Sequence, residues 1–335
     1  MALIDRHRYA KPWGRSLLSL ALALGGIAFV QSTARAGTST PLSQIQAQLK
    51  AAIHLDSLPS DVHPSTSQWT ELWQKDFGAV ATGGGNSACW DQSESSSSLP
   101  ACVFGDRTAT RTLVLTGDSQ AWMWEPAFDS WGQASHWKVI VLAKGSCQPW
   151  PDTQQEFVNN SAFPACGLFQ SKVEKYINTT HPSVVVAAGL VPVIAAPSVP
   201  RVKSDVSTFV TSIKKSHARV LIVNPSPSFY AYDYSAHSTL SAPTCLSTHS
   251  AQLRACDGVE NSQLLDYFMN EVINKTRLPG NSQVLNLSQL LCNSRCPMIA
   301  DGILIYIDND HVSYDWAVHV SGALGEVLSP YLKGL

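Results

Sequence analysis

The sequence is poor in charged residues, and the few that it has are balanced in sign. Asp, Glu, Lys and Arg make up 14% of the 335 residues, with 23 basic against 25 acidic side chains. A chain without a basic surplus has no electrostatic attraction for a nucleic-acid backbone. The mean hydropathy of −0.01 is too low for a protein with many membrane spans. These absences exclude nucleic acid as a partner and leave a globular chain of one large or two modest domains.

Metal-binding patterns are missing as well. The sequence has no HExxH motif and no CxxC pair, so we expect neither a metal nor a cofactor. Metal ligation by the Cys292 and Cys296 pair is the weaker alternative, because no second ligand pair completes such a site. We predict four disulfides that form in an oxidising compartment, because the eight cysteines fall into local pairs: Cys89 with Cys102, Cys147 with Cys166, Cys245 with Cys256, and Cys292 with Cys296.

The first 36 residues have the layout of a secretory signal peptide. Basic residues precede an apolar run from Leu17 to Val30, and Ala34 and Ala36 supply the small residues at the −3 and −1 positions of a cleavage site. The run is shorter than the roughly 20 residues of a spanning helix, although neighbouring small residues could extend it into an uncleaved anchor. We favour cleavage after Ala36 and expect an exported protein that is periplasmic or secreted, with membrane anchoring as the alternative.

The rest of the chain predicts an α/β fold. Residues 37–82 show helical periodicity and are expected to form a helical N-terminal extension. From residue 83 to 335, apolar runs alternate with amphipathic stretches, which predicts a three-layer α/β/α domain with a central, mostly parallel, five-stranded sheet. Residues 226–258 interrupt the alternation and are expected to be an inserted loop near the site. The expected strands are 112–116, 138–142, 183–188, 219–223 and 283–287, and the expected helices are 120–131, 168–178, 204–215, 261–274 and 314–332.

Two short blocks carry candidate chemistry. Gly117-Asp118-Ser119 ends an apolar strand and opens a helix, so the serine lies at the carboxyl end of a strand, although such a serine can also simply cap a helix. A nucleophilic serine needs an imidazole base that a carboxylate orients. Asp308-Asn-Asp310-His311 supplies both near the C-terminus. We prefer Asp308 to its rival Asp310, because a spacing of three returns both side chains to the same side of a turn.

Together these blocks resemble the SGNH (GDSL-type) hydrolase family. More narrowly, they resemble the SGNH domains attached to membrane acyltransferases that modify bacterial cell-surface sugars. That subgroup has cysteine pairs in its loops and a closing Cys-x-x-x-Cys followed by Tyr-x-Asp-x-x-His-x-Ser. The resemblance covers about Cys89 to Leu332 and implies the SGNH, flavodoxin-like fold. Its closing motif appears here as Cys292, Cys296, Tyr306, Asp308, His311 and Ser313.

The resemblance also implies roles for individual residues. Ser119 would be the nucleophile, His311 the general base and then acid, and Asp308 the residue that orients His311. Oxyanion donors would be the backbone N–H groups of Ser119, Gly145 and Gly189. The family often has an Asn near Gly189, and a His often stands in the position that Gln120 fills here, so the chain departs from the pattern twice. Trp122 and Trp124 are candidates for stacking on a sugar ring, with core packing as the alternative.

The function implied is serine-dependent acyl-ester chemistry on an extracytoplasmic carbohydrate, either O-acetyl transfer or O-acetyl ester hydrolysis. The triad does not choose between these two reactions. The expected partners are an acylated glycan or an acceptor sugar and, by family analogy alone, a separate membrane acyltransferase that supplies the acyl group. A catalytically degenerate glycan-binding module is the alternative from another class, and the two departures from the family pattern motivate it.

Overall fold

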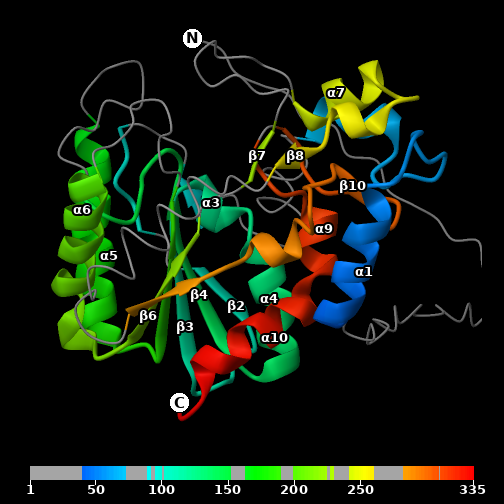
Figure 1. The fold of residues 1–335 in the computed structure, drawn as a ribbon. Helices are drawn as coiled ribbons and strands as arrows, with labels where there is room; N and C mark the ends of the chain where they lie inside the picture. Colours follow the sequence, from blue (N-terminus) through cyan, green and yellow to red (C-terminus); the bar gives the residue numbers. More distant parts are fainter. Residues whose placement is uncertain are drawn as a thin grey trace, which may run out of the picture. The chain divides into compact units, whose positions relative to one another are not determined.

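A seven-stranded sheet organises the computed structural model, with the strand order β1-β4-β3-β5-β6-β9 and with β2 paired to β4 (Figure 1). The structure describes residues 40–72, 89–91, 95–99, 102–151, 163–189, 199–224, 227–229, 241–259, 282–308 and 310–335. The strands of the sheet are β1 (Trp90–Asp91), β2 (Cys102–Gly105), β3 (Thr112–Gly117), β4 (Lys138–Lys144), β5 (Val184–Ala188), β6 (Arg219–Val223) and β9 (Ser282–Leu285). Two small hairpins lie outside it, β7 (Ser228–Phe229) with β8 (Gly258–Val259) and β10 (Ile299–Ala300) with β11 (Ile303–Leu304).

The five strands predicted from apolar runs form the parallel part of this sheet. Strands β4, β3, β5, β6 and β9 are neighbours in that order, and all their pairings are parallel. The sheet is wider than the predicted five strands, because β1 and β2 both pair with the outer side of β4, β2 in the antiparallel direction. Strand β1 has two residues and β2 has four, so neither gives an apolar run long enough to be recognised.

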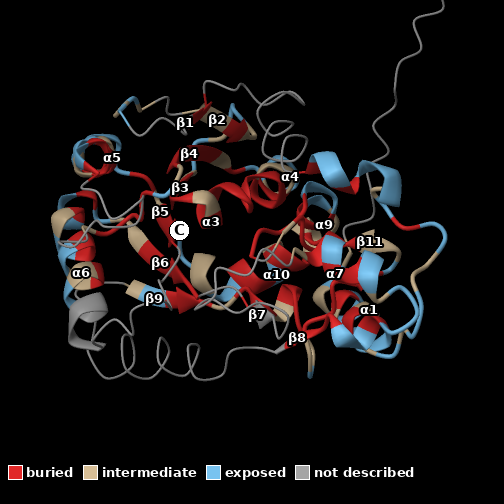
Figure 2. Ribbon diagram, turned by 90° about the horizontal axis from the view of Figure 1, so that it is seen from above, coloured by how far each residue is buried: buried red, intermediate tan, exposed pale blue. Residues whose placement is uncertain are grey.

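Helices cover both faces of the sheet, as the predicted three layers require (Figures 1 and 2). Neighbouring residues of a strand point to opposite faces, so each strand contributes to two apolar cores. Leu113 and Leu115 of β3 belong to the core shared with α4, α9 and α10, whereas Val114 belongs to the core shared with α5 and α6. The described α-helices are α1 (Leu42–Ala52), α3 (Ser119–Trp122), α4 (Glu125–Ser135), α5 (Pro164–Thr180), α6 (Val199–Ser212), α7 (Ala242–Thr248), α9 (Tyr314–His319) and α10 (Ser321–Leu332).

Two predicted helices are divided in the structure. The stretch 120–131 forms α3 and α4, which meet at Met123 and Trp124, and Pro126 stands in the first turn of α4, where its missing N–H costs no hydrogen bond. The stretch 314–332 divides at Val320 into α9 and α10. The predicted helices 168–178 and 204–215 correspond to α5 and α6, and the predicted helix 261–274 lies outside the described residues.

Residues 40–72 pack into the same core as the sheet. Ile45 and Leu49 of α1 are fully buried in the core that contains α10. The backbone of His63 donates to the carbonyl of Gly302 at 2.7 Å and accepts from the N–H of Leu304 at 2.8 Å, so it extends the β10–β11 hairpin. Among the described residues no helix is long and apolar enough to cross a membrane. The predicted signal peptide, residues 1–36, lies outside them.

All four predicted disulfides are present, joining Cys89 to Cys102, Cys147 to Cys166, Cys245 to Cys256 and Cys292 to Cys296. The segment that directly follows Cys256 is joined to the loop that the Cys292–Cys296 disulfide closes. The backbones of Gly258 and Cys296 exchange hydrogen bonds of 2.8 and 3.0 Å, and Arg295 lies 3.4 Å from the carboxylate of Asp257. Burial raises the pKa of Asp257 to about 6, although the charge of Arg295 opposes the shift.

One buried carboxyl should make the stability of the fold depend on pH. Burial, with a smaller contribution from the charge of Asp129, raises the pKa of Glu125 from 4.5 to about 8. Between these two values the folded protein holds a proton that the unfolded chain releases, so the free energy of unfolding should fall as pH rises, by up to about 1.4 kcal/mol per pH unit. Glu125→Gln should remove this dependence, and urea unfolding at pH 5 and pH 8 measures it.

The control for this experiment is Glu174→Gln on the outer helix α5, which should keep the pH dependence of the wild type. Other groups titrate in the same range, so the informative quantity is the difference in slope between Glu125→Gln and the wild type. Equal slopes in the two proteins would show that Glu125 is ionised in the folded state.

Candidate active site

Gly117 sets the position of the candidate nucleophile at the end of β3. Its φ is +145°, and a Cβ added there would lie 1.7 Å from the carbonyl oxygen of Ala188 in the neighbouring strand β5. Only glycine allows β3 and β5 to approach this closely. The order of the parallel strands reverses direction between β3 and β5, and the crevice outside such a switch point is the usual ligand site of an open α/β sheet.

Ser119 is accessible although its surroundings are buried. Every residue from Leu113 to Phe128 is buried except Ser119, which is partly exposed. Asp118 caps α3 by accepting a hydrogen bond from the N–H of Gln120 at 2.8 Å. A partly exposed serine in an otherwise buried turn is accessible to a ligand.

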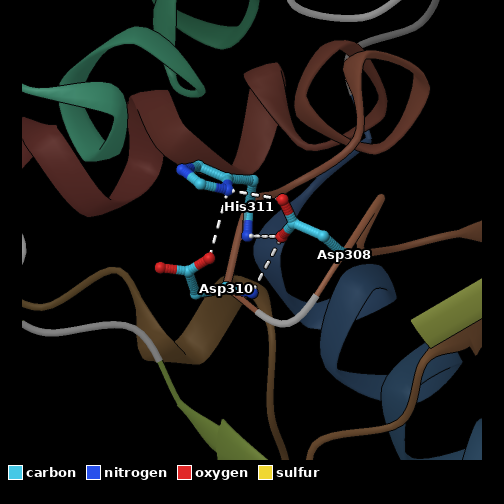
Figure 3. Close-up of side chains that lie close together, drawn as sticks. All are labelled: Asp308, Asp310 and His311. Atoms are coloured by element: carbon cyan, nitrogen blue, oxygen red, sulfur yellow. Dashed lines mark hydrogen bonds and ion pairs between the residues drawn. The ribbon is translucent and has the colours of Figure 1, made fainter. Parts of the chain in front are cut away.

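The candidate base lies on a loop that Asp308 closes with its own side chain (Figure 3). One carboxylate oxygen, Oδ1, accepts from the N–H of Asp310 at 3.0 Å and from the N–H of His311 at 2.8 Å. The other, Oδ2, lies 2.7 Å from Nδ1 of His311. The Asp-x-x-His spacing therefore has a local cause, because a single carboxylate fixes both the backbone of the turn and the ring that the turn presents.

A second carboxylate contacts the same ring nitrogen. Oδ1 of Asp310 lies 3.1 Å from Nδ1 of His311, slightly farther than Asp308, the residue that the spacing favoured. Burial alone would lower the pKa of His311, but the charges of Asp310 and Asp308 and their hydrogen bonds raise it well above its usual value of 6.5. The pKa of Asp308 is lowered, because the charge and hydrogen bond of His311 outweigh its burial.

The loop that carries His311 contacts the helix that begins at Ser119. Nε2 of Gln120 lies 3.3 Å from Oδ2 of Asp310, and the N–H of Val312 donates to Sδ of Met123 at 3.4 Å. The two sequence blocks, about 190 residues apart, therefore lie side by side. From the other side, the N–H of Ala242 donates to the backbone carbonyl of Asp308 at 3.0 Å. Sequence reasoning did not find this last contact, since an alanine backbone has no sequence signal.

The glycines expected to supply oxyanion donors lie at the same edge of the sheet. Gly117 is in register with Ala143 of β4 and with Ala188 of β5, so Gly145 and Gly189 follow the ends of the strands on either side of Ser119. A Cβ on Gly189 would come within 2.7 Å of Pro149, so close packing against the loop after β4 also requires glycine there. The helix that opens at Ser119 has only four residues, so the expected oxyanion site would depend on individual N–H groups rather than on a long helix.

The two candidate tryptophans are not on the surface. Trp122 is 0% exposed and Trp124 is 1% exposed, and the ring of Trp90 stacks on that of Trp122 with centroids 5.2 Å apart. The prediction that these rings stack on a sugar is wrong, because their faces are covered by the core. The alternative of core packing holds for both, and Trp131 is buried as well.

The same acidic loop has the composition of a metal site. Ligand atoms of Asp308, Asp310 and His311 lie within 4.8 Å of one another. Both carboxylates, however, point to Nδ1 of the imidazole, so a cation bound to that nitrogen would have to replace the proton that both contacts share. The arrangement fits an orienting carboxylate for a histidine better than it fits a metal.

Comparisons with known proteins show the family of the chain. Residues 88–325 match the family model described as "SGNH domain (fused to AT3 domains)", and the chain belongs to this family. Among solved structures, the periplasmic domain of a lipopolysaccharide acetyltransferase from Salmonella ser. Paratyphi A matches with a TM-score of 0.56 and 14% identity, covering 80% of this chain and 98% of that one. An acetyl xylan esterase, AlAXEase, matches with a TM-score of 0.36 and 10% identity, covering 66% and 99%. No curated protein sequence matches this chain.

The unusual environment of His311 can be tested without any assay of activity. We expect its ring, followed by NMR, to titrate well above pH 6.5, because two carboxylates face one ring nitrogen. Asp310→Asn should move the titration toward the ordinary value, since it removes one of the two charges. His319 is a suitable internal reference, because burial lowers its pKa. A titration near pH 6.5 in the unmodified protein would contradict this reading of the loop.

Proposed function

We propose that this chain performs serine-dependent acyl-ester chemistry on an extracytoplasmic carbohydrate. The observation that carries the proposal is the contact between the partly exposed Ser119 turn and the loop on which Asp308 fixes His311. Membership of the SGNH family supports acyl-ester chemistry in general. One similar solved structure is the periplasmic domain of a lipopolysaccharide acetyltransferase, and we propose acetyl as the acyl group on that basis.

The proposed mechanism uses the side chains of Ser119, Asp308 and His311 together with backbone N–H groups. Oγ of Ser119 attacks the acyl carbonyl carbon, and the proton of its hydroxyl passes to Nε2 of His311. The proton on Nδ1 of His311 stays there and donates a hydrogen bond to Asp308. The N–H groups of Ser119, Gly145 and Gly189 stabilise the oxyanion. The tetrahedral intermediate collapses, the C–O bond to the leaving alcohol breaks, and that alcohol takes the proton from His311. A sugar hydroxyl or water then attacks the acyl-enzyme, with His311 accepting its proton and returning it to Ser119.

Because His311 must be neutral to accept a proton, its raised pKa has a consequence for the reaction. The protein should be inactive at pH values where the imidazole is charged, and the activity should rise as the pH passes the pKa of His311. The activity should therefore rise at a higher pH than it would with a histidine of ordinary pKa, and a pH profile of acetyl-ester hydrolysis measures this.

Export and delivery of the acyl group complete the proposal. Four disulfides are typical of a protein outside the cytoplasm, and we propose the periplasm or the exterior as its location, with residues 1–36 as the signal or anchor. The family model is named for domains fused to AT3 domains, so we propose that a membrane acyltransferase supplies the acyl group to this chain when it acts as a transferase.

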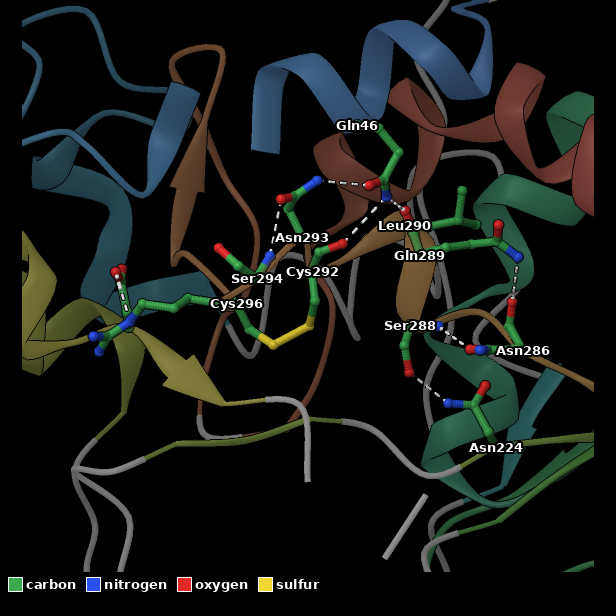
Figure 4. The surroundings of a disulfide bond; sticks show 12 residues. Gln46, Asn224, Asn286, Ser288, Gln289, Leu290, Cys292, Asn293, Ser294 and Cys296 are labelled. Atoms are coloured by element: carbon green, nitrogen blue, oxygen red, sulfur yellow. Dashed lines mark hydrogen bonds and ion pairs between the residues drawn. A yellow bond between two sulfur atoms is a disulfide. The ribbon is translucent and has the colours of Figure 1, made fainter. Parts of the chain in front are cut away.

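A polar pocket at the same edge of the sheet supports carbohydrate as the substrate. It has a volume of about 490 Å³ and is lined by Gln46, Asn286, Ser288, Gln289, Cys292, Asn293 and Ser294, none of them ionisable at neutral pH (Figure 4). Asn286 directly follows β9, which is three strands from β3 in the sheet, on the order of 14 Å. The pocket contains none of the three proposed catalytic residues, so we assign it to binding a distant part of a polymer.

The side chains of this pocket are held in place and still offer hydrogen-bonding groups. Gln46 donates to the carbonyls of Gln289 and Cys292 and accepts from Asn293 at 2.9 Å. Oδ1 of Asn286 accepts from Ser288 at 2.9 Å, and Nε2 of Gln289 donates to the carbonyl of Asn286 at 2.9 Å. Nδ2 of Asn286 and Oε1 of Gln289 make no hydrogen bond to other described residues. A fixed donor beside a fixed acceptor suits hydroxyl groups, which both donate and accept.

Ser119→Ala should abolish turnover. We expect hydrolysis of a chromogenic acetyl ester by the purified protein to fall by at least about 10³-fold, since the hydroxyl that forms the acyl-enzyme is lost. A fluorophosphonate should label Ser119, as peptide mass spectrometry would show, and Ser171→Ala on α5 should leave both results unchanged. Undiminished turnover by Ser119→Ala would refute the proposed nucleophile. Sugar binding without any labelling would instead identify a glycan-binding module that has lost catalysis.

The combined variant Asn286→Ala with Gln289→Ala tests the binding of a polymer. We expect KM for an acetylated polysaccharide to rise several-fold, because two groups that contact a distant part of the polysaccharide are lost. KM for a small acetyl ester should stay the same. Gln283→Ala, an exposed amide on β9 outside the pocket, is the matched control. Equal changes in KM for the two substrates would argue against a binding role for the pocket.

A further inference from the structure

Gln120 is a buried amide beside the loop that carries His311. Its side chain is 4% exposed, and Nε2 lies 3.3 Å from Oδ2 and 3.4 Å from the backbone carbonyl oxygen of Asp310. A single amide group thus contacts both the side chain and the backbone of the residue that precedes His311.

The carboxylate of Asp310 lies between the amide of Gln120 and the imidazole of His311. Oδ2 faces Gln120, and Oδ1 of the same carboxylate lies 3.1 Å from Nδ1 of His311. Asp310 itself is 6% exposed, so water cannot easily replace a missing partner. A carboxylate buried this deeply is stable only with donors on its oxygens, and the amide of Gln120 supplies one of them without adding charge.

A second contact joins the same helical turn to the loop that carries His311. Gln120 and Met123, the residue that caps the C-terminus of α3, are three residues apart and lie on one side of this turn. Met123 accepts a hydrogen bond from Val312, which follows His311 in the loop. The loop is thus attached to the helix of Ser119 by the residues on both sides of His311.

We propose that Gln120 is a positioning residue, which holds the Asp310 carboxylate and through it the His311 loop against the helix that begins at Ser119. The proposal rests on the proposed function for its kinetic meaning, but the link between Gln120 and Asp310 can be measured separately. Asp308 fixes the ring within its own loop, whereas Gln120 fixes that loop relative to the nucleophile.

The experiment is a double-mutant cycle with Gln120→Met, which keeps the size of the buried side chain and removes the donor, and Asp310→Ala. We expect Gln120→Met to lower kcat for a small acetyl ester on the order of tenfold with KM nearly unchanged, because a displaced base slows chemistry more than binding. In the Asp310→Ala background the same substitution should lower kcat less than twofold, because the carboxylate partner is already absent and only the longer contact with the backbone carbonyl remains. Gln133→Ala is the matched control, since that exposed amide on α4 donates to Asp129 at 3.0 Å.

A second readout separates this proposal from the proposed function. In Gln120→Met the NMR titration of His311 should shift from the wild-type value toward that of Asp310→Asn, a change that requires no turnover. If the wild type shows no turnover that depends on Ser119, the proposed function fails while the titration still tests Gln120. An equal loss of kcat in both backgrounds, or an unchanged titration in a folded Gln120→Met protein, would overturn the positioning role. Gln120→Asn, a shorter donor, should restore part of kcat if the donated hydrogen bond is what matters.

Discussion

The site depends on the carboxylate of Asp308, which binds both the backbone of its own loop and the ring of His311. Asp308 holds two backbone N–H groups with one oxygen and the imidazole of His311 with the other. The loop and the ring orientation are therefore a single local unit, and the remaining task of the fold is to bring that unit to Ser119. The contacts from Gln120 and Met123 on α3 and from Ala242 on α7 perform this task from two sides.

The sheet provides the fixed end of this arrangement. Gly117 lets β3 lie close to β5, and the chain then turns at Asp118 into the short helix that carries Ser119. Because the parallel strands are buried on both faces, the turn at their carboxyl edge has little freedom to move. The loop of the proposed base thus lies beside the turn of the proposed nucleophile, and such a fixed arrangement is the preorganisation that acyl transfer needs.

The parallel sheet could be predicted from the sequence because its strands are continuous apolar runs that serve two cores. Short elements carry no such signal, which is why β1, β2 and the β10–β11 hairpin were not predicted. The break between α3 and α4 was missed because the apolar residues continue through it, although Pro126 marks the start of the second helix. Trp122 and Trp124 show what composition cannot decide, because the sequence does not tell whether an aromatic side chain faces a ligand or the core.

The candidate site was accessible to sequence reasoning for a different reason. Asp308 and His311 interact within one turn, so their spacing alone indicates the contact, whereas the link from Gln120 to Asp310 spans 190 residues and only the fold reveals it. Asp310 was weighed as a competitor of Asp308, but the structure places both on the same nitrogen. Local partners can be inferred from a motif, and partners from elsewhere in the chain cannot.

The self-closed loop has a consequence for how such proteins diversify. Since the orienting acid and the base depend on contacts made within four consecutive positions, they can be inherited as a cassette whose inner geometry does not rely on the intervening chain. Loops between β5 and the cassette, as distinct from β6, β9 and the segment of Ala242, can then change in length without disturbing these contacts. Substrate preference can then change in the surrounding loops while Asp308 and His311 stay the same.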